Sequence, residues 1–219
     1  MKAAIDGNPD FGNLWLTLDA GDKVLAESGA MAHMSADVEV KTRLMGGFFK
    51  ALVRRLLAGE SLLVGEYTGR SAGSRLAVSP ALPGEVGFRD FDGDGYYFQA
   101  GSFLASTPGI ALKTKFVGLK ALFSGEGAFF LYCTGTGRLW YNAYGAIVER
   151  DVDGELFVDT GHVVGWEPTL TWKISGTGNF FSTMFSGEGL LLHFQGRGKV
   201  LLQTRSVGAL VSWTKTYLR

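Results

Sequence analysis

The chain has 219 residues, 46% of them aliphatic or aromatic, so it can bury a sizeable core in one or two domains. Its 21 basic and 21 acidic residues cancel, which excludes a role as a polyanion binder through overall charge and leaves only a local basic patch. A single cysteine excludes an intramolecular disulfide, no apolar run reaches the roughly 18 residues of a membrane span, and Asp6 and Asp10 interrupt any signal peptide. These features predict a cytoplasmic protein.

The first predicted elements are two strands, at residues 14–18 and 23–27, around the polar turn Asp19–Asp22. Alternating apolar residues on both sides of a short glycine turn predict a β-hairpin. The same phrase returns twice, with predicted strands at 86–91 and 96–99 and at 146–150 and 155–159. The 32 glycines stand singly or in pairs between apolar runs, which is typical of turns and not of linkers.

A second phrase, Phe-Ser-Gly-Glu-Gly, occurs letter for letter at residues 123–127 and 185–189, with a worn copy at 57–61. The Gly-Glu pairs begin at Gly59, Gly125 and Gly187, spaced 66 and 62 residues apart. A period of that length is too long for a solenoid rung and suits a small β-sandwich or barrel. We therefore predict three repeats, followed by a C-terminal tail: 14–84, 85–145, 146–206 and 207–219.

The predicted fold class is all-β: one compact domain of three β-sandwich or double-stranded β-helix-like units around a pseudo-threefold axis. Packing three units together would cover strand edges and enlarge cores that are small in each unit alone. Apolar residues at helical spacing predict one amphipathic helix near residues 46–58, and residues 207–213 are compatible with a short terminal helix.

The three repeats differ most in a variable insert just before each Gly-Glu pair. The inserts carry apolar residues with a basic rim, and a threefold arrangement would bring them to one face. This candidate interaction face comprises Phe48, Phe49, Leu52, Arg54, Arg55, Leu119, Lys120, Leu122, Phe123, Phe180, Phe181 and Met184. Such a face is typical of a protein contact, and its basic rim suits a peripheral contact with anionic lipid. The competing interpretation is that these aromatic residues plug the ends of the units.

Other candidate chemistry is weaker. The equivalent glutamates Glu60, Glu126 and Glu188 could form a carboxylate ring, but Gly-Glu commonly just opens a turn. His33, His162 and His193 lack metal-ligand spacing, and Cys133 lies in an apolar strand, so no metal, cofactor or catalytic residue is predicted. The glycine-rich segments 135–138 and 196–199 lie between predicted strands, which favours hairpin turns over phosphate loops.

Several motifs, in this order, resemble one known family: residues 27–31, 58–61, 82–85, 123–127, 142–145, 159–162 and 202–206. They are similar to the mitochondrial biogenesis family "altered inheritance of mitochondria 24" and its bacterial members over about residues 3–213. The resemblance implies a fold like the tryptophan RNA-binding attenuation protein, repeated three times. It implies no catalytic or cofactor-binding residues.

The sequence thus favours a non-enzymatic scaffold or interaction protein that docks on a protein partner or forms a homo-oligomer through the insert face. Two alternatives stay open. One is a module that binds a small ligand or RNA between the units, which rests on fold analogy. The other is an enzyme whose titratable groups converge in a cleft that the sequence does not reveal.

Overall fold

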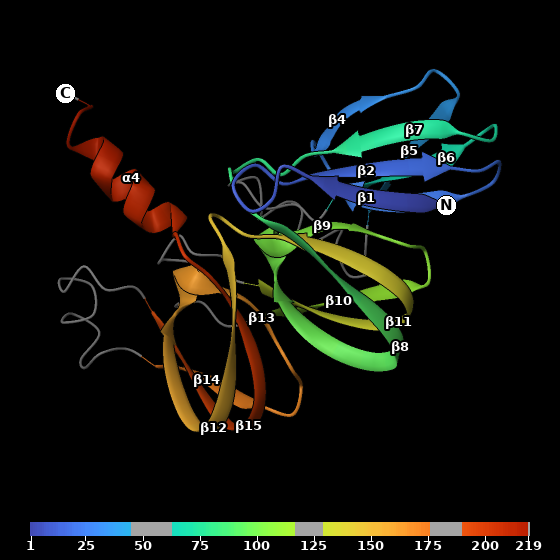
Figure 1. Cartoon of the computed structure of the whole chain (residues 1–219). Coiled ribbons are helices and arrows are strands. Elements are labelled where there is room, and N and C mark those ends of the chain that lie inside the picture. Colours follow the sequence, from blue (N-terminus) through green and yellow to red (C-terminus); the bar gives the residue numbers. More distant parts are fainter. Residues whose placement is uncertain (45–62, 117–128, 176–189, 219) are drawn as a thin grey trace.

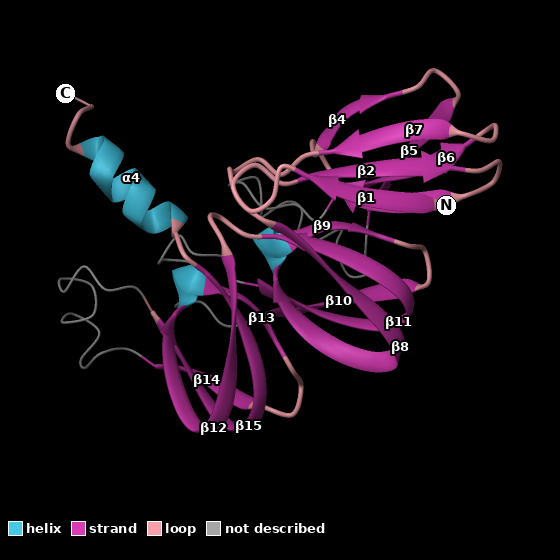
Figure 2. Ribbon diagram, viewed as in Figure 1, coloured by secondary structure: helices cyan, strands magenta, loops and turns pink. Residues whose placement is uncertain are grey.

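The protein is described by a computed structural model that covers residues 1–44, 63–116, 129–175 and 190–218 (Figure 1). This part of the chain is predominantly β-strand, with one short α-helix at the C-terminus, α4 (Val207–Lys215) (Figure 2). The all-β prediction is confirmed. The terminal helix extends two residues beyond its predicted end, and the Ser206 hydroxyl caps it by accepting a hydrogen bond from the Ala209 amide.

The strands form two sheets. One has four strands in the order β1-β2-β7-β4, namely Lys2–Asp6, Asn13–Leu18, Ser74–Val78 and Met31–Met34. The other follows the order β12-β15-β13-β8-β11-β9-β3-β6-β5, with β10 added on β11 and β14 on β15. Its strands, in chain order from β3, are Lys23–Glu27, Val38–Leu44 (β5), Leu63–Gly69 (β6), Val86–Gln99 (β8), Phe103–Ser106 (β9), Ile110–Phe116 (β10), Phe129–Asn142 (β11), Ile147–Asp159 (β12), Val163–Trp166 (β13), Thr171–Ser175 (β14) and Leu191–Gln203 (β15).

The predicted hairpins are wrong in their connection, although their strands exist. Residues 14–18 and 23–27 form β2 and β3, but β2 pairs with β7 while β3 pairs with β6, so the turn between them leads into a different sheet. The two later phrases do not fold back at all. Each is one continuous strand, β8 or β12, that pairs along its length with a single long partner. In both strands the pairing resumes with the same partner strand beyond the glycines, so the chain bends without reversing.

The glycine-rich segments 135–138 and 196–199 are also not hairpin turns, because they lie inside β11 and β15. Gly135 and Gly196 have φ angles of 120° and 118°, a backbone conformation that side-chain-bearing residues rarely adopt. Between Thr134 and Thr136 the pairing of β11 with β8 shifts register, as at a β-bulge. These glycines let the long strands curve, as the bent ribbons in Figure 1 show.

Three antiparallel pairs of consecutive strands share one property: the segment that connects the two strands lies outside the described residues. They are β5 with β6, β10 with β11, and β14 with β15, whose last pairs are Leu44 with Leu63, Phe116 with Phe129, and Ser175 with Leu191. The joining segments are 45–62, 117–128 and 176–189. The predicted helix near 46–58 falls in the first of them and so lies outside the described residues.

Each of three short strands skips one residue against its neighbour. On β4, Met31 pairs with Val78 and His33 with Ala77. The same skip occurs on β9 and β13, where Phe103 pairs with Tyr141 and Ala105 with Trp140, and where Val163 pairs with Leu202 and Gly165 with Leu201. The three strands therefore carry a β-bulge at the same position, which makes the bulge a regular feature of this strand and not a local defect.

The buried side chains gather in three clusters along the chain. The first centres on leucines of β2 and β7, such as Leu14 and Leu76; the second on Phe98 and Leu131; and the third on Trp166 and Phe194. Each cluster borrows residues from the next stretch of chain or the previous one. The core therefore consists of three clusters, and side chains from neighbouring stretches of the chain contribute to each of them.

Candidate functional site

The predicted interaction face belongs to the three joining segments. All of its residues lie in the three joining segments, outside the described part of the chain: Phe48, Phe49, Leu52, Arg54, Arg55, Leu119, Lys120, Leu122, Phe123, Phe180, Phe181 and Met184. The glutamates Glu60, Glu126 and Glu188 fall there too. The described strands fix only where these segments leave and re-enter the sheet, at the ends of the three strand pairs given above.

The three histidines lie apart and make different contacts. The His33 ring on β4 lies 4.9 Å from that of Trp15, and the Nδ1 atom of His162 lies 2.8 Å from the Gln203 carbonyl oxygen. His193 on β15 stacks on Phe157 at 4.1 Å. Within the described ranges, no three histidine, cysteine, aspartate or glutamate side chains come together as a metal site would need.

Cys133 is fully buried in the second core cluster. Burial raises the pKa of its thiol to about 12, because the surrounding apolar side chains disfavour the charged thiolate. At neutral pH the sulfur is therefore a protonated thiol and packs as a small hydrophobic group.

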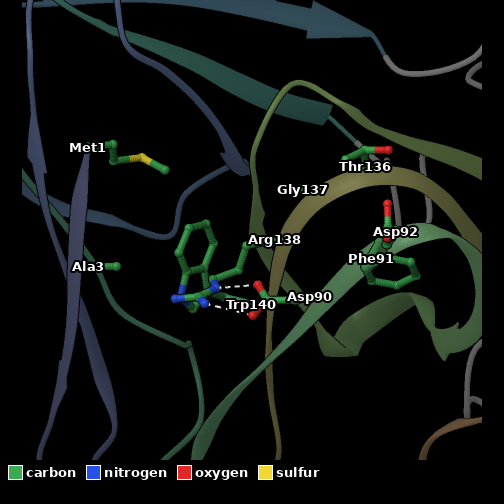
Figure 3. Close-up of a pocket in the computed structure, with 9 residues that line it drawn as sticks. All are labelled: Met1, Ala3, Asp90, Phe91, Asp92, Thr136, Gly137, Arg138 and Trp140. Carbon is green, nitrogen blue, oxygen red and sulfur yellow. Dashed lines mark hydrogen bonds and ion pairs between the residues drawn. The ribbon is translucent and has the colours of Figure 1, made fainter.

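A pocket of about 460 Å³ lies between β1 and the bent strands β8 and β11 (Figure 3). We call it the β1 pocket. It is lined by Met1 and Ala3 from β1 and its N-terminal flank, by Asp90, Phe91 and Asp92 from β8, and by Thr136, Gly137, Arg138 and Trp140 from β11. The two bent strands supply its floor, and β1 of the other sheet supplies its wall.

Two of the charged side chains in the β1 pocket, Asp90 and Arg138, pair with each other. The Nε and Nη2 groups of Arg138 donate hydrogen bonds of 2.6 and 2.7 Å to the two carboxylate oxygens of Asp90, as the dashed lines in Figure 3 show. The guanidinium also lies over the Phe88 ring, 4.3 Å from its centroid. These bonds hold the pKa of the Asp90 carboxyl below its ordinary value. Asp90 and Arg138 thus form a preorganised ion pair beside the aromatic side chains of the pocket.

Sequence reasoning missed this pocket, although a signal was available. Asp90 and Arg138 stand directly opposite each other in the register of β8 and β11. Aligning the two predicted strand segments as one long antiparallel pair would have placed the opposite charges side by side. The hairpin interpretation hid that pairing, because it turned β8 back on itself.

Glu27, at the end of β3, provides a test of buried charge. Burial raises the pKa of its carboxyl to about 7, so the folded state resists ionisation that the unfolded chain accepts. The folded-state pKa is the higher one, so stability is lost as pH rises from the unfolded value of about 4.5 to about 7. We expect the free energy of unfolding of Glu27→Gln, relative to that of the wild type, to rise by up to about 3 kcal/mol between pH 4.5 and pH 8.

Denaturant unfolding of both proteins at several pH values measures this difference. Glu39→Gln is the control with the opposite sign. A hydrogen bond from Lys41 lowers the pKa of Glu39, so this variant should lose stability relative to the wild type as pH rises toward the unfolded value of about 4.5, and the difference should stay constant above it. A difference between Glu27→Gln and wild type that stays constant from pH 4.5 to 8 contradicts the buried carboxyl.

Comparison with known proteins decides the family. A profile of the family described as mitochondrial biogenesis AIM24 matches residues 3–205. The chain belongs to this family. An uncharacterized protein of Streptococcus pyogenes serotype M6 is 28% identical to this AIM24-family chain over 227 residues, which cover 100% of the chain and 91% of that relative.

An X-ray crystal structure of a Streptococcus pyogenes protein superposes on this AIM24-family fold with a TM-score of 0.83. The two share 26% sequence identity, and the match covers 99% of each chain. The predicted family is therefore confirmed, and the architecture described above is shared by a solved relative. Within the described residues, the one α-helix of this AIM24-family protein falls well short of the length and apolar character that a membrane span requires.

Proposed function

We propose that this protein is a non-enzymatic scaffold built from three repeated β-units, which present variable inserts to a partner or to further copies of the chain. The repeat is supported by strand pairing. β8 with β11 and β12 with β15 each form one long bent pair. The split pairs β2 with β7 and β3 with β6 make the same two halves in the first unit.

The single observation that carries the proposal is the common place of the inserts. Each joining segment leaves from the same point of its unit, the end of the pair β5/β6, β10/β11 or β14/β15. The place of the joining segments is thus the same in each unit, while their lengths and sequences vary. Variable loops held at fixed places by a strand framework are a usual arrangement of a recognition surface.

The composition of the inserts favours a protein surface as the partner. Phe48, Phe49 and Leu52 recur at helical spacing in the first insert, and Arg54 and Arg55 follow them. An apolar stripe with charges at its rim is the composition of a helix that docks into a groove or joins a second copy. These residues and the rest of the candidate interaction face form the proposed docking surface.

The double variant Phe49→Asp, Leu52→Asp tests this proposal. Two carboxylates in an apolar contact should abolish recovery of protein partners in a pull-down, and reduce the assembly mass measured by light scattering if copies meet through the inserts. The matched control is Phe11→Asp, whose ring is 73% exposed on a turn far along the chain from the inserts. Unchanged partner recovery together with unchanged mass in the double variant overturns the proposal.

A second candidate function rests on the β1 pocket. Its volume of about 460 Å³ and its position between β1 and the second unit fit a small ligand bound between units. A compound that raises the melting temperature of the wild type, but not of Ala3→Phe with its filled pocket, would favour this function. Compounds that stabilise both proteins equally would bind elsewhere and would count against this function.

A further inference from the structure

Neighbouring units of the chain are joined edge to edge by short stretches of strand. The first unit meets the second where β3 pairs with β9, and the second meets the third where β8 pairs with β13. The paired residues are Leu25 with Ser106 and Ala26 with Ala105 at the first junction, and Tyr97 with Trp166 and Phe98 with Gly165 at the second.

The two junctions have the same register. Ala105 and Gly165 both follow the skipped residue of their strands, and Ser106 and Trp166 come next. At both junctions, a side chain of one unit also packs in the core cluster of the next unit. Val64 of the first unit belongs to the second core cluster, and Phe130 of the second unit belongs to the third. Two junctions that agree in pairing, bulge and packing are one interface used twice.

The same interface has two unused halves. On β4, which corresponds to β9 and β13, His33 and Met34 stand where Gly165 and Trp166 stand in the third unit. On β12, which corresponds to β8, Phe157 and Val158 stand where Tyr97 and Phe98 stand. Across the described ranges, β4 pairs only with β7 and β12 only with β15.

The unused halves expose apolar side chains. All four residues of β4 are exposed, with Met34 at 38%, whereas the corresponding Trp166 is fully buried. Phe157 is 54% exposed, and its ring lies against His193. A strand edge with exposed apolar residues readily pairs with another chain unless something covers it.

A single chain cannot join its own two halves in this conformation. Figure 1 places β4 at the upper right of the molecule and β12 at the lower left, with the second unit between them. The sheet correspondingly ends at β12, and β4 lies in the other sheet. The predicted closure around a pseudo-threefold axis is therefore not made by strand pairing between the first and third described units.

We propose that a second copy of this chain completes the third junction, so that β4 of one copy pairs with the second half of β12 of another. This inference rests on the repeat proposed above, but not on the inserts. The in-chain register predicts that Phe157 pairs with Met34 and Val158 with His33. The thioether of Met34 would then pack against the Phe157 ring, a favourable sulfur–aromatic contact.

The two surfaces of this contact differ, so the association is head to tail. Each added copy leaves one β4 and one β12 edge open, and the assembly grows until it closes as a ring or continues as a filament. This property gives the proposal a test that unfolding cannot mimic. A variant whose β4 edge is disrupted still has an intact β12 edge, and a variant whose β12 edge is disrupted still has an intact β4 edge.

The experiment uses the full chain with Met34→Lys, with Phe157→Lys, and with both variants mixed, each measured by light scattering coupled to size exclusion. The wild type is expected to run as a multiple of its 23.6 kDa mass, and each single variant as a monomer. An equimolar mixture should give a dimer of twice that mass and nothing larger, because only one good junction can form. Phe11→Lys, the exposed control, should assemble like the wild type.

The inference is overturned by a wild type that stays monomeric at every concentration, by single variants that both assemble normally, or by a mixture that stays monomeric while both variants show the wild-type circular dichroism. An assembly lost only in Met34→Lys indicates instead a symmetric β4–β4 contact and also overturns it. The insert variant Phe49→Asp, Leu52→Asp separates the two proposals, because head-to-tail assembly should survive it.

Discussion

Trp166→Ala is expected to lower the free energy of unfolding by about 3–5 kcal/mol, the cost of truncating a large buried aromatic side chain. Trp166 is fully buried at the centre of the third core cluster. Its ring stacks on Tyr97 at 5.2 Å and meets Phe130 edge-on at 4.7 Å. Because both neighbours belong to the second unit, the cavity would weaken the third core and the junction between the units together.

Denaturant or thermal unfolding measures this effect, and each kcal/mol corresponds to roughly 2–4 °C in a chain of this size. Trp213→Ala is the matched control, since that indole on α4 is 60% exposed and its loss should change stability by less than about 0.5 kcal/mol. Among the described residues the Trp166 indole N–H has no acceptor, so Trp166→Phe should cost less than Trp166→Ala. A Trp166→Ala variant as stable as Trp213→Ala would contradict the core assignment.

Gly165→Ala should destabilise the protein by about 1–3 kcal/mol, the usual cost of adding a methylene to a filled space. Gly165 pairs with Phe98 at the second junction. A Cβ there would lie 2.6 Å from the Tyr97 carbonyl oxygen and 2.9 Å from the Tyr96 ring. The oxygen belongs to the backbone, so relief requires the two strands to move apart and the β8–β13 pairing to weaken.

Gly101→Ala is the control for this prediction. Its added Cβ meets no atom within 4 Å, and its φ angle is not in the left-handed region. We therefore expect Gly101→Ala to leave stability unchanged or to raise it slightly, through the lower entropy of the unfolded chain. Equal melting temperatures for the two variants would mean that the junction tolerates a side chain and is looser than the strand pairing implies.

Much of the fold was predictable because alternation and glycine spacing report strands directly. The strands around residues 14–18, 86–91 and 155–159 all exist, and the terminal helix begins at the predicted residue. The connections were not predictable, because a glycine between two strand segments is compatible with both a turn and a bend. Gly154, with a φ angle of 112°, lies in the middle of β12 and reverses nothing. Only the long partner strand decides between the two outcomes.

The candidate sites were less predictable from the sequence than the strands. The predicted interaction face lies wholly in the joining segments, so it stays a prediction. The structure instead reveals two features that depend on pairing between distant strands: the Asp90–Arg138 pair in the β1 pocket, and the unpaired edges at Met34 and Phe157. Neither is local in the sequence. An edge can be recognised as unpaired only when every neighbouring strand has been placed.

Hydrogen–deuterium exchange at low and high protein concentration tests most directly whether the units join through one repeated strand junction. The in-chain junctions, in residues 24–27, 96–99, 103–106 and 163–166, should be protected at both concentrations. Residues 31–34 and 155–158 should gain protection as concentration rises, because a second copy supplies their missing partner. Protection of these two segments that is independent of concentration, or rapid exchange at the in-chain junctions, would contradict the claim that one strand junction is repeated within and between chains.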